Sequence, residues 1–370
     1  MKPLPKHILI IRLSFMGDVA ILVPVIRALR KRYPEVKITV LTRPFFAPFF
    51  RGIRDMRFFH LNFKFRHKGL WGLFRLAGDA KRDGVDAVAD MQDNTTSRTI
   101  RNLLSVKGCR TSHIDKATVS KRRLCRKGYQ NFHQLKTTVE RYADVLRDLG
   151  FELTPCPDIE MSLPVPLAIN YLHGKKTGPW IGIAPFAKYD TKVYPIEQME
   201  RVAATLATRA QKVFVFGGGA EEQRLATRIA AGRENIIPVI GTMSLGDELN
   251  LIANLDVMLT MDSVSMHMGS LVGTPVVSVW GATHPYAGFY GLGQHSDNAV
   301  QLPLECRPCS VNGNIPCRFN DYRCLAGIPP EAIVEKVWAV VGTCAEKRTA
   351  EKRAAEDEDS EKQVTEKQAD

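Results

Sequence analysis

The feature that most constrains this sequence is a strand–helix–strand pattern in its C-terminal half. Two short apolar runs, Leu255 to Thr260 and Pro275 to Trp280, are rich in Val, Leu and Met and are bounded by turn formers. Such runs are typical of buried parallel strands. Between them the spacing of apolar residues predicts a helix over residues 265–272, which Gly273 and Pro275 end. The segment is therefore predicted to be one unit of a parallel α/β sheet.

Polar residues lie between the end of the first strand and the start of the helix. Asp262 and Ser263 are good N-cap residues, and His267 follows within the helix. In a doubly wound sheet, ligands bind at the carboxyl ends of the strands, where helix N-termini expose unpaired N–H groups. We therefore expect these three residues at a ligand site. The alternatives are that Asp262 and Ser263 only cap the helix and that His267 only packs.

The N-terminus repeats the pattern. A buried strand is predicted from His7 to Leu13, a turn from Ser14 to Asp18, a helix from Val19 to Arg32 and a second strand from Val36 to Leu41. Asp18 stands at the ligand end of this unit. The turn is neither a dinucleotide fingerprint nor a phosphate-binding Walker loop, so neither of those chemistries is indicated.

The same alternation extends along most of the chain. Asp90 to Asn94 forms a further polar edge after a strand, and prolines between residues 155 and 166 indicate a linker. The other elements that we predict are strands over Val85–Asp90, Trp180–Ala184, Lys212–Phe216, Val257–Thr260 and Val276–Trp280, and helices over His133–Leu149, Ile196–Arg209 and Pro330–Val341. We also predict a basic loop over Lys121–Lys127 and a loop over Gly217–Glu222 that opens a helix.

These elements divide into two α/β domains. We predict one domain over residues 1–163, a second over 164–344 and a charged, disordered tail over 345–370. Two domains of this kind place an active site in the cleft between them.

Positive charge is concentrated in the N-terminal half of the sequence. Residues 1–178 hold 33 Lys and Arg against 15 Asp and Glu, whereas the whole chain has a net charge of +12. Such a surface attracts polyanions or an anionic membrane, although it can also serve only solubility. The Lys and Arg residues are spread over many elements and no nucleic-acid-binding signature appears, so nucleic acid is not an expected partner.

No apolar run is long enough to span a bilayer, and we expect neither a signal peptide nor a transmembrane helix. Eight cysteines in 370 residues do not make a disulfide scaffold and fit a cytoplasmic protein better. Four of them are closely spaced and either stay reduced or bind a structural zinc ion: Cys306, Cys309, Cys317 and Cys324.

Four stretches in order make the sequence resemble glycosyltransferase family 9, the family of the ADP-heptose:lipopolysaccharide heptosyltransferases. They are Arg12–Val19 with Leu22–Pro24 behind it, Ala184–Phe186 followed by Thr191–Pro195, Phe216–Glu221, and Asp262–His267 leading to Gly273–Val276 and Gly281–Pro285. The resemblance implies the GT-B fold, in which two Rossmann-like α/β domains face each other across a cleft. It implies that the domain over residues 1–163 binds the acceptor and that the domain over 164–344 binds the nucleotide sugar. It also implies an inverting transferase that needs no metal or other cofactor for the transfer itself.

The resemblance assigns roles to residues by position. It makes Asp18 the general base that deprotonates the acceptor hydroxyl and Lys192 the cation that contacts the donor phosphates. It places the donor diphosphate at Asp262, Ser263, Val264 and His267, where relatives often have Gly at position 264. It assigns the nucleotide ribose to Glu221, or to Glu222 if the register slips by one.

The expected activity is transfer of a heptose from ADP-heptose to the lipopolysaccharide inner core, a lipid A–Kdo type of acceptor. We expect a protein held peripherally at the cytoplasmic face of the inner membrane. The alternatives are another nucleotide-sugar donor or a non-catalytic nucleotide-sugar-binding protein. Basic residues expected to bind the phosphorylated acceptor are Arg12, Lys64, Arg66, Lys68, Lys121, Arg122, Arg123, Arg126 and Lys127.

Overall fold

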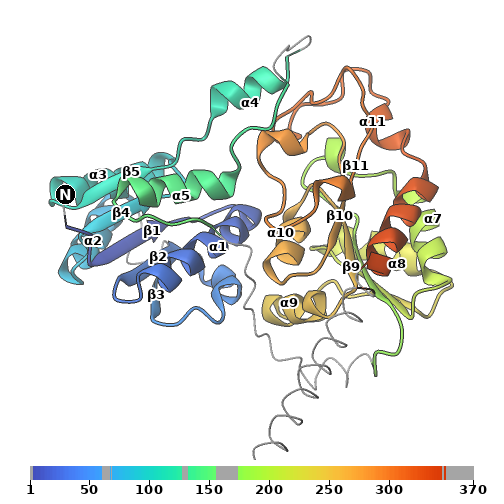
Figure 1. Ribbon diagram of the computed structural model, residues 1–370, viewed down its shortest axis with the longest axis horizontal. Coiled ribbons are helices and arrows are strands. Elements are labelled where there is room, and N and C mark those ends of the chain that lie inside the picture. The colour runs from blue at the N-terminus through green and yellow to red at the C-terminus, as the bar shows by residue number, and fades with distance from the viewer. Residues whose placement is uncertain are drawn as a thin grey trace, which may run out of the picture.

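The computed structural model has two parallel α/β sheets, each flanked by helices (Figure 1). The structure describes residues 3–60, 67, 69–126, 132–155, 174–343 and 346. The predicted domain boundary at residue 163, the proline-rich linker beyond Pro155 and nearly all of the predicted tail lie outside these residues.

The N-terminal sheet has five parallel strands in the order β3-β2-β1-β4-β5. Chain order reverses between β1 and β4, which makes the carboxyl end of β1 a topological switch point. Its strands are β1 (His7–Ile11), β2 (Lys37–Thr42), β3 (Met56–His60), β4 (Ala87–Asp90) and β5 (Arg110–His113). Its helical segments are α1 (Met16–Arg32), η1 (Pro44–Phe50), α2 (Gly69–Arg82), α3 (Thr95–Val106), α4 (Thr118–Leu124) and α5 (Thr138–Asp148).

The C-terminal sheet has six parallel strands in the order β11-β10-β9-β6-β7-β8, and its switch point lies between β6 and β9. Its strands are β6 (Trp180–Ala184), β7 (Lys212–Val215), β8 (Ile236–Pro238), β9 (Val257–Met261), β10 (Val276–Val279) and β11 (Ala299–Val300). Its helical segments are η2 (Asp190–Lys192), α7 (Ile196–Ala207), α8 (Ala220–Ala230), α9 (Leu245–Ala253), α10 (Val264–Leu271), η3 (Pro285–Ala287), η4 (Ser296–Asn298) and α11 (Arg323–Ala326), and residues 330–343 are also helical.

The apolar runs of the sequence become the buried strands. Every residue of β1, β6 and β9 is buried, as parallel strands covered by helices on both faces require. The predicted strands and most helices are confirmed to within a few residues at their ends. Two predictions were wrong in part: the helix expected from His133 begins only at Thr138, and the basic stretch expected to be a loop forms α4 up to Leu124.

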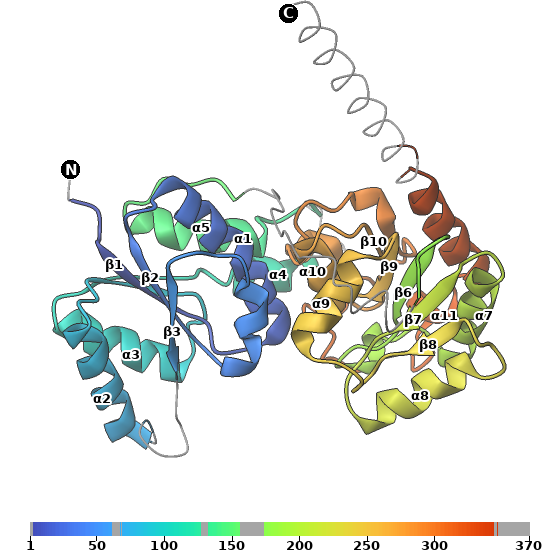
Figure 2. The same cartoon turned by 90° about the horizontal axis from the view of Figure 1, so that it is seen from below.

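The two domains meet along α1 and α10, which lie side by side in both views (Figures 1 and 2). One hydrophobic cluster runs through this junction and includes Val25 and Ile26 of α1, Leu249 of α9 and Met266 of α10. Gly17 permits the close approach, because a Cβ atom there would lie 3.2 Å from the His267 ring and 3.7 Å from the Val264 Cα.

A second contact between the domains is made by backbone. The Leu135 N–H donates to the Tyr286 carbonyl at 2.9 Å, and the Thr138 N–H donates to the Gly288 carbonyl at 2.8 Å. These bonds satisfy polar groups on both sides of the junction. The chain leading into α5 is therefore fixed against the C-terminal domain at η3.

Replacing Gly17 by Leu should lower the free energy of unfolding by about 1–3 kcal/mol, because the new side chain must enter the packed α1–α10 junction. Urea unfolding measures this change. Gly78→Leu is the matched control, since the structure describes no atom within 4 Å of a Cβ at that helical position. Equal stability of the two variants would show that the junction is not tightly packed.

Candidate active site

The first part of the site follows β1. Arg12 is buried at the end of the strand and forms an ion pair with the Asp18 carboxylate through Asp18 Oδ2. Another Arg12 nitrogen, Nη1, donates to the Met91 carbonyl at 2.6 Å. The Phe15 N–H also donates to Asp18 Oδ2, at 3.3 Å. The Asp18 carboxylate is thus fixed in the first turn of α1, beside the junction with α10.

The loop after β4 supports this arrangement. Asp90 is fully buried and accepts hydrogen bonds from the Gln92 and Asp93 N–H groups at 3.0 and 2.8 Å. Gln92 then accepts from the Leu13 N–H at 2.6 Å, and its amide donates to Ser14 Oγ at 3.0 Å. The polar edge predicted at Asp90–Asn94 therefore orders the loop that carries Asp18.

Tyr142 of α5 also contacts this part of the site. Its hydroxyl donates to the Asp18 carbonyl at 3.4 Å, and the Arg12 guanidinium lies 5.8 Å from the centre of its ring. Burial raises the pKa of this phenol, so it stays protonated and remains a donor.

The second part of the site follows β6 and β9. Lys192, in η2, forms an ion pair with Asp262 at 2.9 Å, and Thr283 donates its hydroxyl proton to the same Asp262 oxygen at 2.8 Å. Both charged side chains are largely buried, with 15% of Lys192 and 8% of Asp262 exposed. Lys192 also lies against Gly313, where a Cβ atom would come within 2.5 Å of the lysine Cδ.

The N-terminus of α10 lies in this part of the site. Ser263 is the N-cap residue, but among the described residues its hydroxyl contacts Thr260 Oγ1 at 3.2 Å and does not cap the helix. The first N–H groups of α10, beginning with that of Val264, are thus available to an anionic ligand. Val264 keeps this backbone donor although it carries a side chain where relatives often have Gly.

His267 links the two parts. It is buried beside Gly17 and lies near the charges of Asp18, Asp262 and Lys192. Burial lowers its pKa to about 4, more strongly than the two carboxylates raise it. The ring is therefore neutral at pH 7, so it adds no charge near Asp18 and the Lys192–Asp262 pair.

The sequence of this chain also matches known proteins. The model of glycosyltransferase family 9 (heptosyltransferase) matches residues 73–319, more than half of the chain. The chain belongs to this family. Lipopolysaccharide heptosyltransferase 1 of Pseudomonas aeruginosa is 26% identical over 162 residues, which cover 44% of this chain and 41% of that protein. Lipooligosaccharide heptosyltransferase 2 of Haemophilus influenzae is 30% identical over 115 residues, which cover 29% and 32%. The aligned segments thus span less than half the length of either relative.

The fold is also shared with solved structures. The E. coli ADP-heptose lipopolysaccharide heptosyltransferase II superimposes with a TM-score of 0.69 at 18% sequence identity, over 91% of this chain and 99% of that one. This chain therefore has the GT-B fold of the family, as the sequence predicted.

The structure separates the two candidate ribose contacts. Glu221 is exposed and pairs with Arg224 one turn later, at 2.6 Å, which lowers the pKa of its carboxyl. Glu222 instead turns back and accepts from the Gly218 N–H at 2.7 Å. A glycine is required at 217, where a Cβ atom would lie 2.7 Å from the Glu222 carboxylate. Of the two, Glu222 is the residue that shapes the loop.

The candidate acceptor residues are dispersed. Arg12 is committed to Asp18 and Met91, so it is better described as a positioning residue than as an acceptor contact. Arg122 and Arg123 are exposed on α4. Lys64, Arg66, Lys68 and Lys127 lie outside the described residues. Lys121 is buried, with its ammonium 3.9 Å from the centre of the Phe289 ring of the other domain.

The four closely spaced cysteines are free thiols, and Cys309 lies near the sulfurs of Cys306 and Cys317. Burial is the largest cause of a raised pKa at Cys309 and Cys324. Within the described ranges no three His, Cys, Asp or Glu side chains come together so that they could hold a metal ion.

Sequence reasoning did not single out Gln92, Tyr142 or Thr283 as site residues. Gln92 lies within the polar edge that the sequence does reveal, and Thr283 lies within the Gly281–Pro285 motif, so both carried a signal. Tyr142 lies within the helix predicted over His133–Leu149, with nothing to mark it as a site residue. Its contact with Asp18 joins residues 124 positions apart and has no local signature.

His267 should make stability depend on pH. Its pKa is about 4 in the folded chain but about 6.5 when unfolded, so the unfolded chain binds the proton first as pH falls. The free energy of unfolding should therefore decrease as pH falls from 6.5 to 4. Urea midpoints across this range should fall less steeply for His267→Gln than for the unaltered protein. His295→Gln, at an exposed position, is the control and should leave the slope unchanged.

Proposed function

We propose that this protein transfers a heptose from ADP-heptose to the inner core of lipopolysaccharide, with inversion at the anomeric carbon. The observation that carries the proposal is the α1–α10 junction, where neutral His267 interacts with the charges of Asp18 from one domain and of Lys192 and Asp262 from the other. Membership of family 9 and the likeness to an ADP-heptose heptosyltransferase support it.

Asp18 is proposed as the general base. Direct displacement at an anomeric carbon needs a group that takes the acceptor hydroxyl proton as the new bond forms. Both the Arg12 and the Phe15 contacts are made by Asp18 Oδ2. These contacts fix the carboxylate and leave Oδ1 as the oxygen that receives the proton.

Lys192 and α10 are proposed to stabilise the leaving diphosphate. A nucleoside diphosphate gains negative charge as the glycosidic bond breaks, and a buried ammonium with helix N-terminal amides favours that charge. Lys192 is paired with Asp262, so a bound diphosphate would compete with Asp262 for the ammonium. We assign the transfer step to these protein groups, without a metal ion.

Lys121 is proposed to receive an anionic group of the acceptor. It lies at the domain junction over Phe289, near the charge of Asp18. Burial, followed by the charge of Arg141, lowers its pKa to about 8, so it is still mostly protonated at pH 7. An acidic acceptor sugar would supply the counter-charge that this ammonium needs.

The acceptor is proposed to be a phosphorylated glycolipid, held at the cytoplasmic face of the inner membrane. Among the described residues, no helix is long and apolar enough to cross a bilayer. We propose peripheral attachment, supported by the excess of Lys and Arg in the N-terminal half.

Asp18→Asn should abolish heptose transfer while leaving ADP binding within about twofold of the original, because the base is lost and the donor residues are on the other domain. Glycosyl transfer to a lipid A–Kdo acceptor and calorimetric ADP titration measure the two effects. Asp86→Asn, in the same domain but away from Asp18, is the control. Retained transfer in Asp18→Asn would remove Asp18 from the mechanism.

Calorimetric titration with ADP, UDP and GDP should show a preference for ADP. Lys192→Gln should weaken ADP binding and lower kcat by roughly 100-fold or more, since it removes the charge facing the leaving group. Lys212→Gln, on β7, is the matched lysine control. A preference for UDP or GDP would mean that the donor carries a different nucleotide, with the proposed mechanism unchanged. If none of the three nucleotides bound, the transferase proposal would be contradicted.

A further inference from the structure

The solvent-exposed face of helix α2 has an unusual composition, with large apolar side chains at one end and basic side chains at the other. Its inner face buries Leu73, Leu76, Ala77 and Ala80 in a hydrophobic cluster beneath it. At 100° per residue, positions 70, 71, 74, 75, 78, 81 and 82 fall together on the opposite side. This outer face runs from Leu70 to Arg82, roughly 18 Å along the helix axis.

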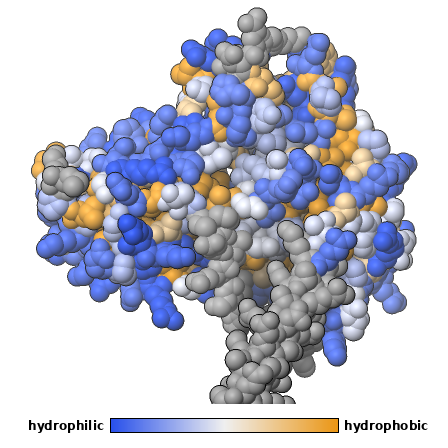
Figure 3. Space-filling model, in the orientation of Figure 1, coloured by the Kyte–Doolittle hydropathy of each residue, from blue (hydrophilic) through white to orange (hydrophobic). Residues whose placement is uncertain are grey.

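The first half of the outer face is apolar. Leu70, Trp71 and Phe74 are 68%, 82% and 50% exposed, and the two aromatic rings lie 5.9 Å apart. The outward side of a surface helix is ordinarily polar, and clustered exposed apolar side chains indicate an interaction site. In the view of Figure 3, the surface of this domain is mostly hydrophilic, with apolar side chains in a few patches.

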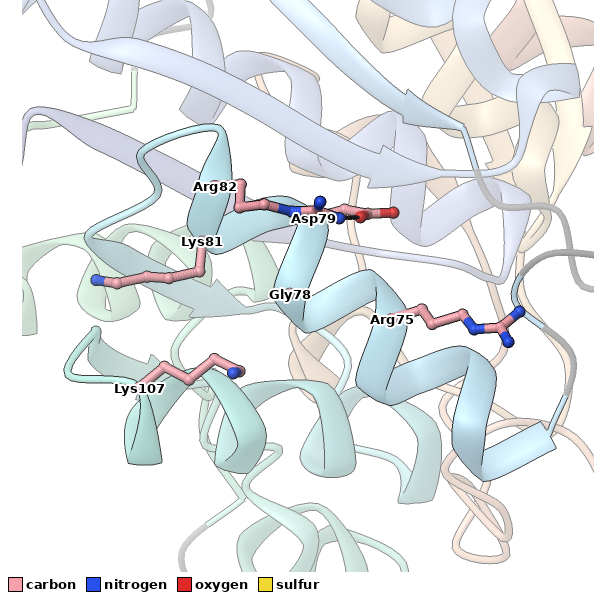
Figure 4. A pocket seen from close by; sticks show the side chains of 6 residues that line it. All are labelled: Arg75, Gly78, Asp79, Lys81, Arg82 and Lys107. Atoms are coloured by element: carbon pink, nitrogen blue, oxygen red, sulfur yellow. Dashed lines mark hydrogen bonds and ion pairs between the residues drawn. The ribbon is translucent and has the colours of Figure 1, made fainter.

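The second half of the outer face is basic. Arg75, Lys81 and Arg82, together with Lys107 at the end of α3, line an open groove of about 710 Å³ (Figure 4). Asp79 pairs with Arg82 and neutralises one of these charges. The groove therefore carries an excess of positive charge directly beside the apolar cluster.

We propose that the outer face of α2 docks on an anionic phospholipid bilayer. Leu70, Trp71 and Phe74 enter the boundary between headgroups and acyl chains, and Arg75, Lys81 and Lys107 contact lipid phosphates. Charge complementarity selects this partner, because a few large apolar side chains flanked by cations on one helix match the layered polarity of a membrane surface. The net charge of +18 over residues 1–178 adds long-range attraction.

The position of α2 suits this role. In both views it lies at the side of the N-terminal domain away from α10 (Figures 1 and 2). Docking through α2 therefore leaves the α1–α10 junction free. This inference rests on the proposed function for its purpose, since the membrane would hold the glycolipid acceptor, but its test does not require transfer.

The test is co-sedimentation of the full chain with phosphatidylcholine vesicles, with and without phosphatidylglycerol. We expect binding to need phosphatidylglycerol, and Trp71→Ala should weaken it about tenfold. Phe319→Ala, which removes an exposed aromatic ring from the other domain, is the matched control and should bind as before. Arg75→Gln should weaken binding, whereas Arg233→Gln on the C-terminal domain should not.

Tryptophan fluorescence gives a second readout. Of the four tryptophans, Trp180 and Trp280 are buried in the core and Trp338 lies beneath Arg209, so Trp71 is the one that a membrane can reach. Anionic vesicles should shift its emission to shorter wavelength, and brominated lipids should quench it. Trp71→Ala should lack both responses at an unchanged melting temperature.

The outcomes separate this inference from the proposed function. Trp71→Ala should keep full turnover on a soluble acceptor without acyl chains, and Asp18→Asn should lose turnover but still bind vesicles. Vesicle binding that is unaffected by Trp71→Ala, or that is equal without phosphatidylglycerol, would overturn the docking proposal. Self-association that depends on Trp71, with no vesicle binding, would overturn it in favour of a protein interface.

Discussion

The close approach of α1 and α10 is the contact on which the rest of the site depends. Each helix starts at the switch point of its own parallel sheet, so packing them together brings two ligand-binding edges into one place. Gly17 makes this possible, because a side chain there would meet His267 and Val264. The hydrophobic cluster at this junction includes Val25, Ile26 and Met266, whereas Asp18 and Ser263 stand at the N-terminal ends of the two helices.

Each domain satisfies its own charges at this junction. Arg12 pairs with Asp18 in one domain, and Lys192 pairs with Asp262 in the other. Buried charges need such partners, and a neutral His267 near both pairs avoids a further desolvation cost. A charged substrate entering here would exchange partners with an existing pair, which couples donor binding to the position of Lys192.

The sequence predicted the strands well and the site residues only in part. Short apolar runs located β1, β6 and β9, because parallel strands that are buried on both faces consist mostly of apolar residues. It also placed Asp18, Asp262 and His267 at strand ends. It failed at α4, where a run of Lys and Arg concealed a short helix. It also did not predict that Arg12, which a charge-based argument assigned to the acceptor, pairs with Asp18.

By itself, the sequence determined the two α/β units, their order and the strand ends that carry polar residues, since these depend on neighbours within a few positions. Only the tertiary structure decided which of those ends meet and what each side chain contacts. Arg12 reaches the Met91 carbonyl 79 residues away, and Tyr142 reaches Asp18 across 124. Contacts over such separations follow from strand order and helix packing, which no local pattern of residues encodes.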